Sequence, residues 1–138
     1  MELDLNDNSF DNSTPVEENM ITVTIWLDDL RDPFSHEWSE VIGMHAPETE
    51  IVLWAKNYEE FVSYFCQVND DPTVRLVAVF FDNDLGSGKE GRHAFTWMEE
   101  QVREKLIPSF ILHAHTSNPS ARKELNGGFE SLRRFWWS

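Results

Sequence analysis

The sequence is poor in cysteine, in basic side chains and in long apolar runs. A single cysteine, Cys66, among 138 residues can form neither an internal disulfide nor the thiolate set of a structural zinc site. Lys and Arg number 11 against 25 Asp and Glu, and the resulting formal charge of −14 argues against direct binding to duplex DNA. No apolar run reaches the roughly 18 residues of a membrane span, and no basic-then-apolar signal opens the chain. We therefore expect a cytoplasmic protein with no membrane contact.

Hydrophobic and aromatic residues are abundant enough to build a core. They make up 41% and 13% of the chain, and 138 residues correspond to one domain. Residues 1–19 differ, because they carry six acids and no Lys or Arg. We predict a disordered acidic tail over 1–19 and a folded domain over 20–138. The tail is interpreted as a solubilising leader, and the alternative is a docking arm for a basic protein partner.

Four apolar segments have the composition of buried strands, and helical patterns alternate with them. The predicted strands are 22–27, 50–55, 75–81 and 110–115. Helices are predicted after Asn57, which forms a capping-box pattern with Glu60, after Gly91 and after Asn118-Pro119. The stretch containing Pro33 and Pro47 is predicted as loop, and Gly127-Gly128 is predicted to interrupt the last helix. The alternation predicts an α/β domain with a mainly parallel sheet and helices on both faces.

Polar side chains follow three of these strands where the strands end. Asp28 and Asp29 follow the first, Asp82 and Asp84 the third, and His115 ends the fourth. Ligands of open α/β sheets bind at the carboxyl ends of the strands, so we expect the acids to converge there. Like charges at short range need raised pKa values or a cation, and oxygen ligands favour magnesium or manganese. Such an ion can polarise a phosphoryl oxygen, so phosphate chemistry is the expected use.

Each acidic strand end also has a plain structural interpretation. Asp82-Asn83-Asp84 can serve as turn residues that cap a helix, and Asp29 to Asp32 can form a surface turn with an ion pair. We favour a functional site because two such ends occur on strands expected to be neighbours. His113 is predicted to be a core histidine.

Three segments, in order, resemble a known family. They are Trp26–Pro33, Phe81–Gly86 and His115–Arg122. Together they are similar to the motifs of the cyclic-phosphate-processing receiver-like family, a shortened relative of response-regulator receiver domains, and the resemblance covers residues 22–126. It implies a three-layer, receiver-like (flavodoxin-like) domain with a small, mainly parallel sheet of about four strands.

The resemblance also implies roles for individual residues. It makes Asp28, Asp29 and Asp82 metal-site acids, with Asp84 in support. The phosphate-facing side chains it implies are His115, Asn118 and Arg122, and we expect Arg31 and Thr116 to bind the phosphate with them. Of the metal-site and phosphate-facing residues together, Asp82 and His115 are the expected catalytic residues. His115 is expected to protonate the leaving oxygen.

Two positions depart from the family pattern. Asn83 stands where the family usually has a histidine, and Ala121 stands where it usually has a glycine. True receivers also carry a lysine on a fifth strand, and no such strand or lysine is visible here. Phosphorelay signalling on Asp82 is therefore the weaker hypothesis.

The expected function is that of a phosphoesterase dependent on magnesium or manganese. Its expected substrate is a small molecule or RNA end that carries a cyclic phosphate, such as a nucleotide or an ADP-ribose derivative. The alternative is a non-catalytic acidic interaction protein, of viral type, that inhibits a nucleic-acid or nucleotide-processing enzyme. The net charge and Asn83 suit this alternative.

Overall fold

The structure, a computed structural model, describes residues 19–138 and contains one parallel sheet of four strands. The strands are β1 (Ile21–Leu27), β2 (Ile51–Ala55), β3 (Val74–Phe81) and β4 (Ile111–Ala114). Their order is β2-β1-β3-β4, so β1 and β3 lie in the middle. The predicted receiver-like α/β fold is confirmed. The predicted acidic tail falls almost wholly on residues 1–18, which lie outside the described residues.

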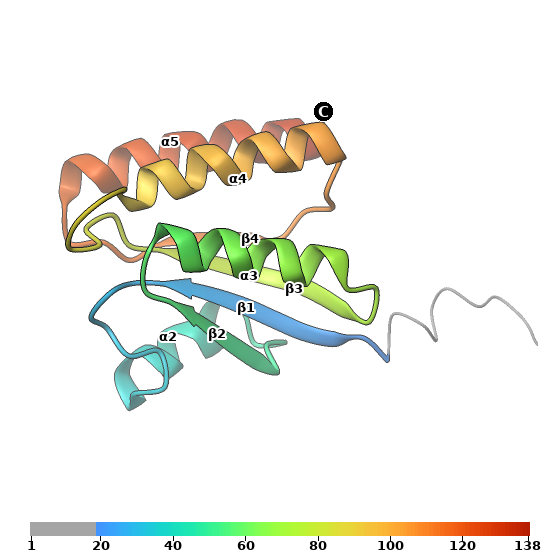
Figure 1. The fold of residues 1–138 in the computed structure, drawn as a ribbon, viewed down its shortest axis with the longest axis horizontal. Coiled ribbons are helices and arrows are strands. Elements are labelled where there is room, and N and C mark those ends of the chain that lie inside the picture. Colours follow the sequence, from blue (N-terminus) through green and yellow to red (C-terminus); the bar gives the residue numbers. More distant parts are fainter. Residues whose placement is uncertain (1–18) are drawn as a thin grey trace, which may run out of the picture.

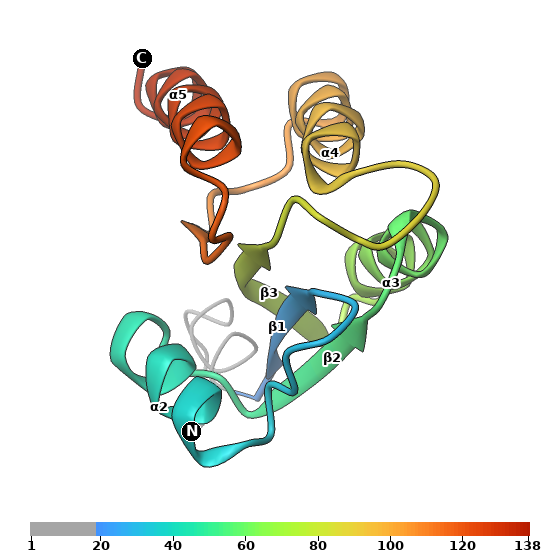
Figure 2. The ribbon, with the colours of Figure 1, turned by 90° about the vertical axis from the view of Figure 1, so that its left-hand side faces the viewer.

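Along the part of the chain that the structure describes, four helices cover the sheet unequally. They are α2 (His36–His45), α3 (Tyr58–Asp70), α4 (Gly91–Lys105) and α5 (Pro119–Trp136). Helices α3, α4 and α5 lie over one face and α2 lies over the other (Figure 1). Figure 2 shows the same arrangement viewed along the strands. Within residues 19–138, none of the helices combines the length and the apolar character that crossing a membrane requires.

Strand residues alternate between the two faces because side chains along a strand point alternately up and down. Ile25 and Leu27 of β1 pack in the core beneath α3, α4 and α5, whereas Trp26 packs toward α2. In β3, Phe81 packs on the face covered by α3, α4 and α5, and Phe80 packs on the face covered by α2. Both central strands are thus buried on both sides, as their continuous apolar sequences predict.

Helix α2 was missed by the sequence prediction, which assigned this stretch to a loop. Its start is capped by Ser35, whose hydroxyl accepts a hydrogen bond from the Trp38 amide at 3.4 Å. Ile42 and Trp38, one turn apart, pack against Trp26 and its neighbours on the sheet. Pro33 and Pro47 lie outside the two ends of the helix and therefore bracket it without breaking it.

The predicted interruption of the last helix is also wrong, because α5 continues through Gly127 and Gly128. Gly128 lies against α4, where a Cβ atom would approach a ring carbon of Phe95 to 2.5 Å. Its missing side chain lets the two helices pack closely, so this glycine serves packing and does not end the helix. The predicted start is confirmed, since Asn118 caps the helix and Pro119 is its first residue.

His113 of β4 stacks on His45 of α2 with ring centroids 4.1 Å apart, and its ring edge meets Phe80. Burial, followed by the charges of His45 and His115, lowers the pKa of His113 to about 4. A folded-state pKa below the ordinary value of 6.5 means that folding favours the neutral ring. The stability from this group is therefore complete above pH 6.5 and is lost as the pH falls toward 4.

A His113→Phe variant is accordingly expected to resist acid better than the wild type. Between pH 7 and pH 4.5 its free energy of unfolding should fall by about 1 kcal/mol less than that of the wild type, after allowance for solvent screening. Urea denaturation across this pH range measures the difference. A His36→Gln variant, which removes an exposed histidine, should behave as the wild type. Equal acid sensitivity in His113→Phe and wild type would contradict the expectation.

Candidate metal and phosphate site

The candidate site lies at the carboxyl ends of β1 and β3, where the chain leaves two neighbouring strands in opposite directions. From β1 it passes to β2 on one side, and from β3 to β4 on the other. Such a switch point leaves a crevice above the sheet and is where open α/β sheets bind ligands. The ladder of main-chain hydrogen bonds continues to this point, because the Asp82 amide donates to the Leu27 carbonyl at 2.9 Å.

Three carboxylates meet at this edge. Asp28, Asp29 and Asp82 each offer one oxygen, and these oxygens lie within 4.8 Å of one another. Asp28 and Asp82 are buried and Asp29 is half-buried. We call these three residues the carboxylate cluster. The predicted fourth member, Asp84, is exposed and does not belong to the cluster. The two-residue alternation that would align Asp84 with Asp82 ends with β3 at Phe81.

Asp28 is held by four hydrogen bonds. Its Oδ1 accepts from the amides of Leu30 at 2.8 Å and Arg31 at 2.9 Å. Its Oδ2 accepts from Arg31 Nη1 at 3.1 Å and interacts with His115 Nε2 at 2.9 Å. Burial by itself would raise the pKa of Asp28, but the bonds from His115, the two amides and the guanidinium lower it to about 2. Asp28 is therefore a fixed, ionised carboxylate.

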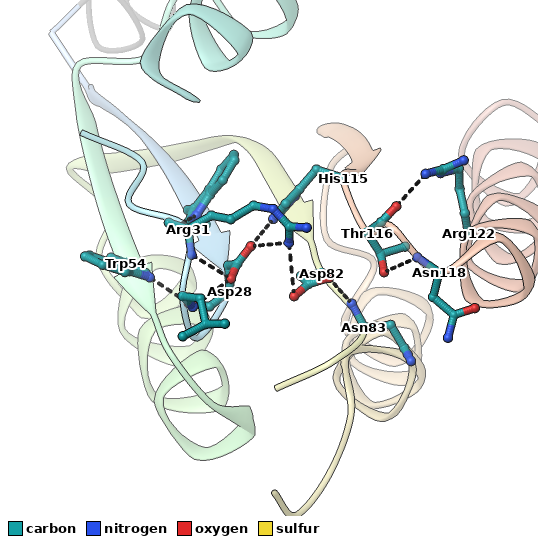
Figure 3. Close-up of polar contacts among 11 residues, drawn as sticks. Asp28, Arg31, Trp54, Asp82, Asn83, His115, Thr116, Asn118 and Arg122 are labelled. Carbon is teal, nitrogen blue, oxygen red and sulfur yellow. Dashed lines mark hydrogen bonds and ion pairs between the residues drawn. The ribbon is translucent and has the colours of Figure 1, made fainter. Parts of the chain in front are cut away.

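Arg31 bridges the cluster. Figure 3 shows its guanidinium between Asp28 and Asp82, with Nη1 lying 3.5 Å from Asp82 Oδ2. Burial raises the pKa of Asp82, and the charge of Asp28 raises it further, while His115, Thr116 and Arg31 oppose the shift. One guanidinium thus faces three carboxylates, which leaves the cluster with an excess of negative charge. A divalent cation can neutralise that excess.

His115 contacts the carboxylate cluster through Asp28, on the side of Trp26. Its side chain is only 2% exposed, and its ring stacks on Trp26 with centroids 4.0 Å apart. One ring nitrogen, Nε2, faces Asp28, and the other, Nδ1, is buried without a hydrogen-bond partner among the described residues. The transfer of a proton from His115 to a leaving group stays a prediction, and in this structure the contact with Asp28 Oδ2 fixes the orientation of that carboxylate.

The remaining residues predicted to bind phosphate hold the turn between β4 and α5. The Asn118 side chain accepts from the Ala121 amide at 3.1 Å, and the buried Thr116 hydroxyl accepts from the Asn118 amide at 3.2 Å. Arg122 donates to the Thr116 carbonyl at 2.6 Å and lies beyond Thr116 as seen from Asp82 (Figure 3). The structure therefore brings Thr116 to the cluster but leaves Arg122 apart from it.

Two tryptophans that the sequence analysis had assigned no role support the loop that carries Asp28 and Arg31. The indole of Trp26 donates to the Arg31 carbonyl at 2.9 Å, and that of Trp54 donates to the Asp28 carbonyl at 2.7 Å. Trp26 and Trp54 are register partners on adjacent strands. The sequence signal for this support is a tryptophan near the end of each of two neighbouring strands, because a buried indole N–H needs an acceptor nearby.

Asn83 and Gly91 join the cluster to α4. The buried Asn83 side chain accepts from the Arg92 amide at 3.2 Å, so it pairs a main-chain amide in the first turn of α4, whose capping box is formed by Glu90 and His93. The Gly91 amide donates to the Asn83 carbonyl at 2.9 Å. At the position where the family usually has a histidine, this chain therefore uses a neutral side chain to anchor a helix.

Comparison with known proteins agrees with the fold and the three motifs. No curated protein and no solved structure matches the chain. Among protein families, the one described as the cyclic-phosphate processing receiver domain matches residues 23–131. This range includes all four strands except the start of β1 and extends well into α5. The resemblance found in the sequence is confirmed, and the chain belongs to the cyclic-phosphate processing receiver domain family.

Proposed function

We propose that this protein is a divalent-metal-dependent phosphoesterase that opens a cyclic phosphate on a nucleotide, an ADP-ribose derivative or an RNA end. The observation that supports it is the carboxylate cluster, with three oxygens within 4.8 Å at the switch point of a domain in this family. All three donors are carboxylate oxygens, which is the chemistry that magnesium and manganese prefer. The donor set therefore fits such an ion.

Asp28, Asp29 and Asp82 would hold the cation. When bound, the ion supplies Lewis acidity for a phosphoryl oxygen and lowers the pKa of a coordinated water. Asp28 needs no rearrangement to present its charge, because backbone amides fix its Oδ1. His115 orients Asp28 from the buried side. A preorganised site of this kind avoids the cost of reorganisation during the reaction.

Arg31 is the best-placed residue to bind the substrate phosphate. Its guanidinium is at the cluster and its side chain is 29% exposed, so it can face both the acids and an incoming anion. Guanidinium geometry suits two oxygens of a phosphate. Arg122 lies farther along the same edge, and it would join only if its bond to the Thr116 carbonyl were released.

Phosphorus NMR of a panel of cyclic phosphates tests the proposal. The full chain is incubated with cyclic phosphates of a nucleotide, of ADP-ribose and of an RNA end, each with manganese, magnesium or a chelator. Ring opening moves the phosphorus resonance to that of a phosphomonoester, and we expect this change only with metal. Absence of product from every substrate with either metal would contradict the proposal and favour the interaction-protein alternative.

A further inference from the structure

Arg31 lies on the same carboxylate oxygens that a divalent cation would need. Asp28 Oδ1 is already committed to the amides of Leu30 and Arg31, and Asp82 Oδ1 accepts from the Asn83 amide at 2.9 Å. Each buried acid therefore has one oxygen, Oδ2, that is free of main-chain donors. Arg31 Nη1 lies 3.1 Å from Asp28 Oδ2 and 3.5 Å from Asp82 Oδ2. Asp28 Oδ2 also interacts with His115 Nε2 at 2.9 Å, so both of its lone pairs are occupied, and a divalent cation can bind this oxygen only in place of Arg31.

The side chain of Arg31 can leave the cluster while its backbone stays. The Arg31 carbonyl accepts from the Trp26 indole, and the Arg31 amide donates to Asp28. The guanidinium, in contrast, has no partner in the described structure besides the acids and the ring of Trp38, whose centroid is 5.6 Å from its central carbon. With 29% of the side chain exposed, an outward path to solvent exists.

We propose that Arg31 is a built-in counterion that occupies the carboxylate cluster until a divalent cation displaces it, and that the displaced guanidinium then binds the substrate phosphate. The inference rests on the proposed function for the identity of the cation. It assigns Arg31 two successive partners, the carboxylates of the free protein and the phosphate of the loaded one.

This exchange couples metal binding to phosphate binding. Before exchange, the positive charge of the guanidinium partly offsets the negative charge of the buried carboxylates. After exchange, a free guanidinium beside a dication is repelled unless an anion joins them. Metal and phosphate should therefore each raise the affinity for the other, by the same factor. When metal binds without a phosphate, Arg31 loses its contact with the acids and gains no new partner. The affinity of the site for metal is therefore lower when no substrate is present.

Manganese binding to the full chain, followed by the electron paramagnetic resonance signal of free Mn²⁺, tests the exchange. The wild type is compared with Arg31→Gln and with Arg75→Gln, which removes an equal charge from an exposed pair with Glu48. Arg31→Gln should bind Mn²⁺ at least about tenfold more tightly than the wild type, since a competing cation has been removed. Arg75→Gln should bind as the wild type does. Inorganic phosphate should tighten Mn²⁺ binding to the wild type, and this gain should be lost in Arg31→Gln.

Tryptophan emission reports the displacement itself. Mn²⁺ should change the emission of the wild type, and the change should be smaller in Trp38→Phe, because Trp38 is the ring beside the guanidinium, whereas Trp26 and Trp54 remain at the site. This readout needs no substitution at Arg31, so it holds even if Arg31→Gln does not fold. Mn²⁺ binding to the wild type with no Trp38-dependent change would overturn the exchange.

The outcomes separate this inference from the proposed function. If the wild type binds Mn²⁺ and opens cyclic phosphates but Arg31→Gln binds no more tightly, the exchange is overturned and the phosphoesterase stands. If only Arg31→Gln binds Mn²⁺, the ion does not displace Arg31 in the wild type, which overturns the exchange and excludes Mn²⁺-dependent turnover by the wild type. If neither protein binds Mn²⁺, both ideas are overturned.

Discussion

An Asp82→Asn variant is expected to lose metal-dependent opening of a cyclic phosphate by at least about a thousandfold, which corresponds to about 4 kcal/mol of transition-state stabilisation. Asparagine keeps the shape of the side chain and an oxygen that can accept from the Asn83 amide. It removes one of the two buried charges of the carboxylate cluster. Initial rates by phosphorus NMR with saturating manganese measure the loss.

Loss of folding would not explain this result. Because burial raises the pKa of Asp82, the ionised form is less favourable in the folded chain than in the unfolded one. Removing the charge should leave the melting temperature at neutral pH equal to that of the wild type or higher. Asp84→Asn is the matched control, since it removes an equal charge two residues away at an exposed position outside the cluster. Full activity in Asp82→Asn, or an equal loss in Asp84→Asn, would contradict the assignment.

A Gly91→Ala variant is expected to be less stable by about 3 kcal/mol, because the added methyl group overpacks a rigid contact. A Cβ at Gly91 would lie 1.9 Å from the Asp82 carbonyl oxygen and 2.8 Å from its carbonyl carbon, both main-chain atoms. Either α4 or the end of β3 must move, and the second movement displaces Asp82 itself. Urea denaturation followed by circular dichroism measures the stability, and Mn²⁺ titration measures the disturbance of the cluster.

The sign of this effect is informative, because helix propensity alone favours alanine over glycine by about 1 kcal/mol. Gly127→Ala provides the matched control within α5, where nothing lies within 4 Å of the added Cβ. This variant should be more stable than the wild type by about 0.5–1 kcal/mol. A Gly91→Ala protein as stable as Gly127→Ala would contradict the close approach of Gly91 to the Asp82 carbonyl.

The sheet and three of the four helices were predictable because their signals are local. The continuous apolar run of β3 identifies a strand covered on both faces, and the cap at Asn57 marks the start of α3. Helix α2 was not predictable in the same way. Its apolar residues meet only the narrow face around Trp26, so they give a weak periodic signal between two prolines. Gly128 likewise depends on a ring of another helix, which no local pattern reveals.

The composition of the site was predictable, but its connections were not. Strand ends locate Asp28 and Asp82, and the switch-point rule brings them together. The contact of Arg31 with both Asp28 and Asp82 depends on its side-chain conformation. The same is true of Arg122, which bonds to the Thr116 carbonyl and so lies apart from the cluster. The burial of His115 against Trp26 required α2 and the sheet together. Contacts between segments far apart in the sequence decide which residue of a motif reaches a substrate. The spacing of residues along the chain does not reveal those contacts.

The continuation of the sheet's hydrogen bonds into the acidic edge makes the anionic centre part of the frame of the domain. The Asp28 amide donates to the Ala55 carbonyl of β2, and the Asp82 amide donates to the Leu27 carbonyl of β1. The main chains of Asp28 and Asp82 therefore cannot move apart without breaking hydrogen bonds between neighbouring strands. The mutual repulsion of their carboxylates must therefore be relieved in place, by a bound cation, by Arg31 or by protonation of Asp82, whose pKa burial and the charge of Asp28 raise.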